Sequence, residues 1–312
     1  MLMENHRGTG KKKQNVEFRY YEMPSQSYLL ALLGERWIMN YGTEAVHFHN
    51  YLEIGYCYYG EGHMMLEGEN FEYRGQMFTV IPKSCPHCTR SEQQQISRWE
   101  YLFIDVEGFL KEVYKERPGF AKKAGVETER KAGRLPPAAV CPDRRTDCEI
   151  LLEEMREKQE FHKESIRGYL LALLVELARK SEEGEETLQP GGDEKRIAVV
   201  LDYIAEKFAE DIKVSDLAAL CHVSETHFRR IFEKMMNVSP AEYMNMIRIQ
   251  HACTLLKETR ESVETVREKV GFSTASTFNR NFQKMVQMSP RQWRNQEGSR
   301  LVDYKISIYK GW

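Results

Sequence analysis

One seven-residue pattern occurs twice near the carboxyl end of the chain and decides the fold. Residues 228–234 read FRRIFEK and residues 278–284 read FNRNFQK. The matching positions share an offset of 50 residues and are Phe228/Phe278, Arg230/Arg280, Phe232/Phe282, Lys234/Lys284 and, just beyond, Pro240/Pro290. Apolar residues four apart share one face of a helix, so each copy predicts an amphipathic helix with basic residues facing outward. Two such helices favour binding to one long polyanion, and DNA binding is the first hypothesis.

A short helix and a tight turn are expected before each copy. In the first unit Ser215 is expected to cap a helix that ends near residue 221, and Ser224 to cap the next helix after a turn at 222–223. The second unit repeats this order at residues 264–270, 271–272 and 274–286. A helix, a short turn and a second helix form the helix-turn-helix motif, whose second helix enters the major groove of DNA. Residues 195–296 therefore predict an all-α domain with two such motifs.

This segment resembles the DNA-binding domain of the AraC-type bacterial transcription regulators. The residues that carry the resemblance are Phe228-x-Arg230-x-Phe232, Ser239-Pro240, Arg248, Leu255-Leu256, Gly271-Phe272, Phe278-x-Arg280-x-Phe282-x-Lys284 and Ser289-Pro290. In that family both recognition helices enter successive major-groove segments, which implies DNA contacts from Thr226, His227, Arg229 and Arg230 in the first helix and from Ala275, Ser276, Thr277, Asn279 and Arg280 in the second. Arginine can bond a guanine edge with two donors, and asparagine can bond an adenine edge.

The departures from the family pattern concern packing and turns. Arg267 occupies the small-residue position that Ala218 fills in the first unit, and we expect it to loosen the second pair of helices. His222 stands where the first turn usually has glycine, which costs strain if its φ is positive. Asn237 and Gln287 replace the glycines that usually end the recognition helices. We therefore expect the first unit to dominate base recognition.

The composition is that of a globular protein large enough for two domains. Of 312 residues, 41% are hydrophobic and 29% charged, and no stretch approaches the ~20 apolar residues that span a bilayer. Seven scattered cysteines favour reduced thiols in a cytoplasmic protein over a disulfide framework. The net charge of −2 is unevenly divided, because residues 196–296 hold 15 Lys and Arg against 12 Asp and Glu whereas residues 1–195 hold 27 against 33. The basic excess lies in the segment that carries the repeat, as a phosphate-binding face requires.

The first half of the chain is predicted to be β-structure. Aromatic and branched segments alternate with glycine-containing turns, at residues 15–23, 52–59, 63–66, 77–81 and 99–106. This spacing is typical of an antiparallel barrel or sandwich. Apolar residues then follow helical spacing from 146 to 180, and an acidic segment with glycine and proline predicts a flexible linker at 181–194. The predicted fold class is thus an all-β barrel with added helices (14–180) followed by an all-α DNA-binding domain (195–296).

Two motifs in the first half resemble those of the cupin barrels, which AraC-type regulators commonly carry ahead of the DNA-binding domain. They are Gly42-(x4)-His47-x-His49-(x3)-Glu53-(x6)-Gly60 and Gly75-(x6)-Pro82-x-Ser84-(x2)-His87, with Ser84 in place of a glycine. In metal-binding cupins the matching residues His47, His49, Glu53 and His87 form a divalent metal site. The alternative is that these four residues contact an effector or are structural. Nearby aromatic side chains, Trp37 and Tyr56 among them, would line a pocket suited to a sugar or another flat ligand. About half of these aromatic residues must instead face the outer surface or pack the barrel, because strand residues alternate.

Two further features leave alternatives open. Cys85-Pro86-His87-Cys88 has the form of a redox CxxC motif, but such motifs act at a helix N-terminus and this segment is predicted at the end of a strand. A redox enzyme is therefore not expected, although a supplementary thiolate ligand is possible. The apolar helices between 146 and 180 are expected to pair with a second subunit, as is common in the resembled family, and packing within one subunit is the alternative.

These observations favour a cytoplasmic, non-enzymatic transcription regulator that binds double-stranded DNA, responds to a small-molecule effector and forms a homodimer. RNA polymerase is an expected partner if the protein activates transcription, whereas a membrane is not expected, and no cofactor is required. A metal-dependent cupin enzyme with a helical appendage is the competing hypothesis. A constitutive DNA-binding protein with a vestigial barrel is the third.

Overall fold

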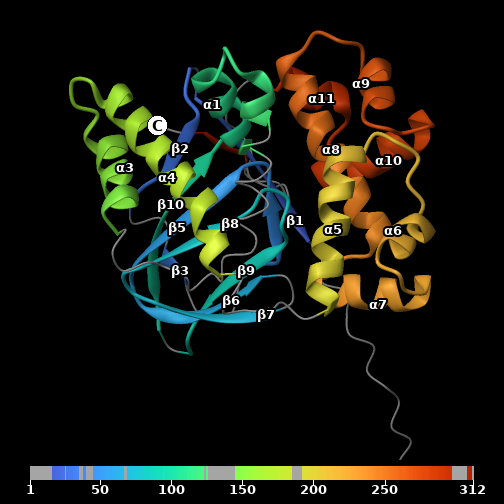
Figure 1. Cartoon of the computed structure of the whole chain (residues 1–312). Coiled ribbons are helices and arrows are strands. Elements are labelled where there is room, and N and C mark those ends of the chain that lie inside the picture. The colour runs from blue at the N-terminus through green and yellow to red at the C-terminus, as the bar shows by residue number, and fades with distance from the viewer. Residues whose placement is uncertain are drawn as a thin grey trace, which may run out of the picture.

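The computed structural model describes residues 16–24, 26–34, 38–39, 45–66, 69–93, 95–122, 124–125, 145–184, 192–296 and 308–310. A β-domain with helices on one side lies beside an all-helical domain, and β1 is on the side of the barrel that faces the helical domain (Figure 1). The two-domain fold class expected from the sequence is confirmed.

The barrel consists of two sheets. The larger sheet has the strand order β11-β1-β4-β9-β6-β7, with bounds Ile308–Lys310, Glu17–Glu22, His47–His49, His87–Ser91, Glu61–Leu66 and Glu69–Arg74. The smaller has the order β2-β10-β5-β8 with β3 beside β10, and the bounds of β2, β3, β5, β8 and β10 are Leu29–Leu32, Ile38–Met39, Leu52–Tyr59, Met77–Ile81 and Ser97–Ile104. Neighbouring strands are antiparallel except that β1 runs parallel to β4 and β11. The five predicted strand segments correspond to β1, β5, β6, β8 and β10, whereas β2 and β4 are too short for a periodic pattern to identify.

Side chains on the two faces of β5 belong to two different hydrophobic cores. Leu52, Ile54 and Tyr56 face the helices α1 (Val106–Val113), α3 (Arg145–Glu157) and α4 (His162–Gly184), while Cys57 faces the space between the sheets. The buried leucines of α4 pack on the same outer face of the small sheet and are Leu170, Leu173, Leu174 and Leu177. These leucines of the 146–180 region are therefore buried within the subunit, against the small sheet.

The predicted linker is shorter than expected. Helix α4 continues to Gly184 and α5 already begins at Gly192, so helix covers both ends of the 181–194 segment. Glutamates in this segment are good helix formers, which explains the extension of α4. Residues 185–191 lie outside the described residues.

The helical domain contains seven helices between residues 192 and 296. Their bounds, from α5 to α11, are Gly192–Lys207, Val214–Leu220, Glu225–Met236, Pro240–Glu258, Val263–Lys269, Ala275–Val286 and Pro290–Asn295. The phenylalanines of both repeats are buried, with Trp293 at the centre of the same core. The expected cap at Ser215 is wrong, because α6 begins after Lys213, whose backbone N–H donates to the Asp216 carboxylate at 3.0 Å.

At the three positions where this chain has another residue in place of the family's glycine, the backbone has a positive φ. His222 has a φ of 53°, and Asn237 and Gln287, each at 56°, end α7 and α10 in the left-handed conformation. Gly271 has a φ of 84° at the corresponding turn of the second unit. His222 therefore occupies a conformation that a glycine would adopt at lower cost.

Arg267 does not simply displace a packing residue. Its side chain is buried, and its guanidinium donates to the backbone carbonyl of Phe272 in the turn that follows α9. It also forms ion pairs with Glu264 at 2.7 Å and Glu268 at 3.0 Å. Arg267 thus joins α9 to the turn before α10, so the expected loosening at this position is replaced by a polar connection that a small residue could not make.

Candidate functional site

The predicted DNA-contacting side chains lie on the outward faces of α7 and α10. The exposed members are Thr226, Arg229, Arg230, Ala275, Ser276, Asn279 and Arg280, and His227 and Thr277 are half-exposed. Ser224 accepts a hydrogen bond from the His227 backbone N–H at 3.3 Å, and Thr274 accepts one from Thr277 at 3.2 Å. These caps start both helices just before the candidate residues, so the candidates occupy the N-terminal turns that contact bases in helix-turn-helix proteins.

The arginines of the two recognition helices have different surroundings. Arg229 pairs with Glu225 one turn earlier at 2.7 Å, and Arg230 Nη2 lies 3.1 Å from His227 Nδ1. Within the part of the chain that the structure describes, Arg280 has no ion pair or side-chain hydrogen bond. Contact of Arg229 with DNA therefore requires it to leave Glu225, whereas Arg280 meets no such competition.

The remaining residues of the resemblance hold the recognition helices in place. Arg248 of α8 donates to the carbonyls of Phe208 and Glu210, at 2.7 and 2.8 Å. Ser239 and Ser289 cap α8 and α11, each followed by proline at the first helical position. These residues are structural, and they explain why the Ser-Pro pair recurs after each recognition helix.

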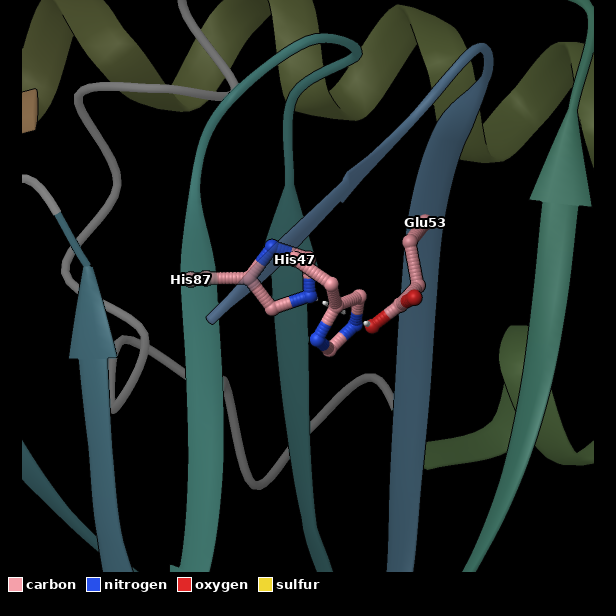
Figure 2. Close-up of side chains that lie close together, drawn as sticks. All are labelled: His47, Glu53 and His87. Atoms are coloured by element: carbon pink, nitrogen blue, oxygen red, sulfur yellow. Dashed lines mark ion pairs between the residues drawn. The ribbon is translucent and has the colours of Figure 1, made fainter. Parts of the chain in front are cut away.

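The barrel brings together residues from three strands, as Figure 2 shows for His47 on β4, Glu53 on β5 and His87 on β9. One potential ligand atom from each lies within 4.8 Å of the others. His49 Nε2 is 3.2 Å from one Glu53 oxygen, and His87 Nε2 is 3.8 Å from the other. Because His47 pairs directly with His87 across β4 and β9, the two distant motifs meet. We call His47, His49, Glu53 and His87 the histidine cluster.

All three imidazoles of the histidine cluster are oriented by the backbone. Nδ1 of His47, His49 and His87 lies 3.1, 2.7 and 3.0 Å from the carbonyl oxygens of Ala45, Tyr51 and Cys85. A carbonyl only accepts, so each Nδ1 carries a hydrogen and each Nε2 is left for a further contact. His49 Nε2 is buried, and the Glu53 carboxylate is the polar group beside it. Metal-ligating histidines are held in this way by their second nitrogen.

Burial sets the protonation states of the cluster. Burial, with the positive charge of Arg19 next in importance, lowers the pKa of His47 well below its usual value. Burial also lowers the pKa of His87 to about 4. Burial alone would raise the pKa of Glu53, but attraction to His49 and then to His87 and Arg19 outweighs it and lowers that pKa. Neutral His47 and His87 beside an ionised Glu53 are the forms that bind a cation.

Arg19 is a cluster neighbour that sequence reasoning missed. Its Nη1 lies 2.9 Å from His47 Nε2, so the guanidinium donates to the lone pair that a metal would use. The parallel register of β1 on β4 places it there. The donor set fits a divalent metal, and coordination by His47 requires Arg19 to withdraw.

The cluster has no room for an organic ligand in this conformation. His47, His49, Glu53 and His87 expose 3, 0, 4 and 1% of their surfaces. A cavity large enough for a sugar would expose the side chains that line it. The four residues therefore surround a space suited to an ion, and their predicted direct contact with a sugar would need the barrel to open.

Tyr56 is separated from the cluster and is one of the aromatic residues that face away from it. It lies on the opposite face of β5 from Glu53, stacks on Phe78 with ring centroids 4.5 Å apart, and donates to Glu149 of α3 at 2.7 Å. Trp37 lies outside the described residues. Cys85 and Cys88 are buried, and neither joins the group of converging ligand atoms found in the described ranges.

A cavity of about 520 Å³ lies near Tyr56, between the small sheet and α3. Its lining residues are Tyr58, Arg98, Glu149, Ile150, Glu153 and Arg156. Arg98 lies at a register shift in the pairing of β10 with β5, and its guanidinium is 4.7 Å from the centre of the Tyr58 ring. Arg156 pairs with the buried Glu100 at 2.7 Å. The cavity thus offers donors, acceptors and an aromatic face.

A barrel with a candidate ligand site, joined to two helix-turn-helix units, defines a ligand-responsive transcription regulator. Residues 29–174 match the family described as AraC-like ligand binding domain, and residues 217–296 match a helix-turn-helix domain. The chain belongs to the AraC-type transcription regulators.

Several proteins of known sequence or structure are similar to this chain. An uncharacterised HTH-type transcriptional regulator, YfiF of Bacillus subtilis, is 22% identical over 97% of this chain and 95% of its own length. The lactose operon transcription activator of Staphylococcus xylosus is 30% identical, over 30% of this chain and 34% of its own length. Among solved structures, ToxT of Vibrio cholerae covers 86% of this chain and 98% of its own, with 14% identity and a TM-score of 0.42. The DNA-binding domain of AdpA bound to target DNA covers 32% of this chain and 89% of its own, with 26% identity and a TM-score of 0.31.

The helices of the described ranges give no candidate membrane span, because none combines sufficient length with sufficient apolar character.

Proposed function

We propose that this chain binds a specific operator through α7 and α10 together and that occupancy of its barrel domain changes that binding. The observation that carries the proposal is the division of each recognition helix into a buried phenylalanine face and an exposed face with arginine and hydrogen-bonding side chains. Arg230 and Arg280 occupy equivalent positions on the exposed faces of α7 and α10, so both can contact the bases of one DNA duplex.

The operator is found by selecting duplexes from random DNA with the full chain, and affinity is then measured by fluorescence anisotropy across a salt series. Replacing Arg230 and Arg280 together with alanine should weaken binding ~30-fold or more, since each base-contacting arginine contributes ~1–3 kcal/mol. Arg90→Ala, an exposed arginine of the barrel, is the matched control and should leave affinity unchanged. Retained sequence preference in the double variant would contradict the proposal.

We propose that the effector occupies the cavity between the small sheet and α3. Arg98 and Arg156 supply donors, Glu149 and Glu153 supply acceptors, and Tyr58 offers a ring on which a flat apolar face can stack. A polyhydroxylated molecule such as a monosaccharide matches this set. A thermal-shift panel of monosaccharides against the full chain tests it, because a ligand that binds the folded state raises its melting temperature. The shift should disappear in Arg98→Ala and persist in Arg90→Ala, and a shift that survives Arg98→Ala excludes this location.

We also propose that the histidine cluster holds a divalent metal ion with a structural role. The three fixed imidazoles, the ionised Glu53 and the lack of space for a larger occupant support it. Zinc is the first candidate for such a nitrogen-rich site. Metal content after dialysis against Zn²⁺ should fall by about one equivalent per chain in His87→Ala. It should be unchanged in His63→Ala, whose histidine is exposed and paired with Glu92.

The proposed regulatory role also leads to proposals for the oligomeric state of the chain and its location in the cell. We propose a homodimer through the surface of α3 and α4, where Phe161 is 70% exposed at the turn between them. We propose a cytoplasmic location, where chromosomal DNA is accessible, and contact with RNA polymerase if the protein activates its promoter. Sedimentation of wild type and Phe161→Ser tests the dimer, because loss of this apolar contact should shift the protein toward monomer.

A further inference from the structure

Ser84 departs from the cupin pattern, which has glycine at this position. It has a φ of 63°, in the left-handed region that glycine adopts freely and serine adopts only at a cost in free energy. A non-glycine residue that keeps such a conformation points to a use for its side chain. The structure shows what the hydroxyl does.

The Ser84 hydroxyl connects the two domains. Its Oγ donates to Gln250 Oε1 at 2.6 Å. Gln250 lies in the middle of α8, and both residues are buried, with 6 and 7% of their surfaces exposed. A buried amide that loses its partner is left with an unmet hydrogen-bonding group, so this contact favours the docked arrangement of barrel and helical domain.

Ser84 also contacts the histidine cluster. Its backbone N–H donates to the carbonyl of His49 at 2.8 Å. The segment between β8 and β9 that contains Ser84 leads directly to His87, three residues later. One short segment is therefore held by the cluster through its backbone and by α8 through a side chain.

The apolar contacts around this hydrogen bond link the same elements. Phe48 lies between two cluster histidines on β4, stacks on Phe18 at 4.8 Å, and belongs to the core that contains the helical domain. Tyr20 meets Trp293 edge to face at 4.9 Å. The strand that supplies His47 and His49 is thus connected to the DNA-binding domain through β1.

We infer that the Ser84–Gln250 hydrogen bond couples the histidine cluster to DNA binding by positioning α8. Helix α8 joins the two helix-turn-helix units and contacts both α7 and α10. A shift of α8 therefore changes the separation of the two recognition helices, which must match the spacing of major-groove segments. The inference rests on the proposed control of DNA binding by the barrel and names the contact through which that control acts.

A double-mutant cycle on DNA affinity tests the coupling without requiring a known effector. Glu53→Gln perturbs the cluster from β5 and leaves Ser84 in place. Ser84→Gly removes the hydroxyl while suiting the positive φ, so the segment can fold. The probe is the duplex selected by the wild-type chain. Glu53→Gln should change the Kd at least ~5-fold, and in the Ser84→Gly background its effect should fall below ~2-fold.

The matched control is Ser91→Ala, which removes another buried barrel hydroxyl, one that bonds Ser97 and lies away from α8. The full effect of Glu53→Gln should persist in this background. An effect of Glu53→Gln that is equal in the wild-type and Ser84→Gly backgrounds would overturn the inference.

Hydrogen exchange of the α8 amides gives a second measurement that needs no DNA. Glu53→Gln should raise exchange in peptides covering 240–258 by at least ~3-fold, and should add nothing further once Ser84→Gly is present. If α8 exchange does not respond to Glu53→Gln, the coupling is wrong whatever the DNA result. If α8 responds but no duplex is selected, the proposed DNA-binding function fails and the coupling within the chain stands.

Discussion

Gly271 is the residue of the second helix-turn-helix turn whose replacement the structure constrains most sharply. It has a φ of 84°, and a Cβ built on it would lie 2.5 Å from the carbonyl oxygen of Ala209 and 2.8 and 2.9 Å from the carbonyl carbon and Cα of that residue. All three atoms belong to the backbone between α5 and α6, so no side chain can rotate away. Gly271→Ala must therefore strain the turn and push it away from Ala209.

Two contributions to the loss of stability add together for Gly271→Ala. A residue with a Cβ in the left-handed region costs ~1–2 kcal/mol, and an added methyl in a packed site costs ~1–3 kcal/mol. The free energy of unfolding of the helical domain should fall by ~2–5 kcal/mol. For a domain of this size the melting temperature should drop by at least ~8 °C, since each kcal/mol shifts it by ~4–8 °C.

His222→Gly is the complementary control, because His222 holds the equivalent turn of the first unit at a φ of 53°. Relief of strain by ~1–2 kcal/mol is offset by ~0.5–1 kcal/mol of added flexibility in the unfolded chain, so a small gain in stability is expected. Both variants are compared with wild type by urea unfolding of the full chain, followed by the helical circular dichroism signal.

Anisotropy with the selected duplex shows whether the strain reaches α10. Affinity should fall in Gly271→Ala even at temperatures where the domain remains folded, because the turn sets the position of the recognition helix. A stability within ~1 kcal/mol of wild type would refute the reasoning, since the costs above have a lower sum of ~2 kcal/mol. It would mean that the contact with Ala209 is looser than the structure indicates.

Three further measurements address the DNA face, the histidine cluster and the effect of pH. Arg230→Ala and Arg280→Ala should each weaken DNA binding by ~5-fold or more, and an unchanged affinity in either variant would show that this arginine does not contact bases. Arg19→Gln should raise Zn²⁺ affinity at least ~10-fold in a chelator competition, because it removes a positive charge 2.9 Å from His47 Nε2; an unchanged affinity would exclude His47 as a ligand. Burial lowers the pKa of His251 to about 4, below its usual 6.5, so the unfolded chain binds a proton that the folded chain does not. Stability should fall as pH decreases from 6.5 toward 4, by up to ~3 kcal/mol from this group, and His251→Leu should show a smaller fall in urea titrations at pH 7 and 4.5.

The helical domain was predictable from the sequence because its signals are local. Caps, helical periodicity and the two copies of one pattern act over a few residues, and the predicted recognition helices match α7 and α10 closely. The Ser215 cap was wrong by two residues because a carboxylate at Asp216 reaches back to Lys213, a choice between two nearby caps that residue type alone does not settle. Arg267 was misjudged for a similar reason, since its bond to the Phe272 carbonyl depends on the path of the turn.

The barrel contains contacts that could not be predicted from the sequence. The two histidine motifs could be matched to strands, and the structure places His47, His49, Glu53 and His87 together. Alternation predicts that Glu53 and Tyr56 lie on opposite faces of β5 but not which face is internal, and the structure shows that Tyr56 faces the helices. Arg19 could not be found at all, because its place beside His47 depends on the parallel pairing of β1 with β4, strands 28 residues apart.

By itself the sequence determined two helix-turn-helix units, a β-domain before them and four residues of one cluster, because repeats and periodicity encode local structure and faces. Only the tertiary structure decided that the cluster is closed to solvent, that Arg19 donates to His47, and that the Ser84 hydroxyl reaches Gln250 across the domain boundary. These contacts join residues as far as 166 positions apart. Their geometry depends on how whole sheets and helices pack, which no local pattern specifies.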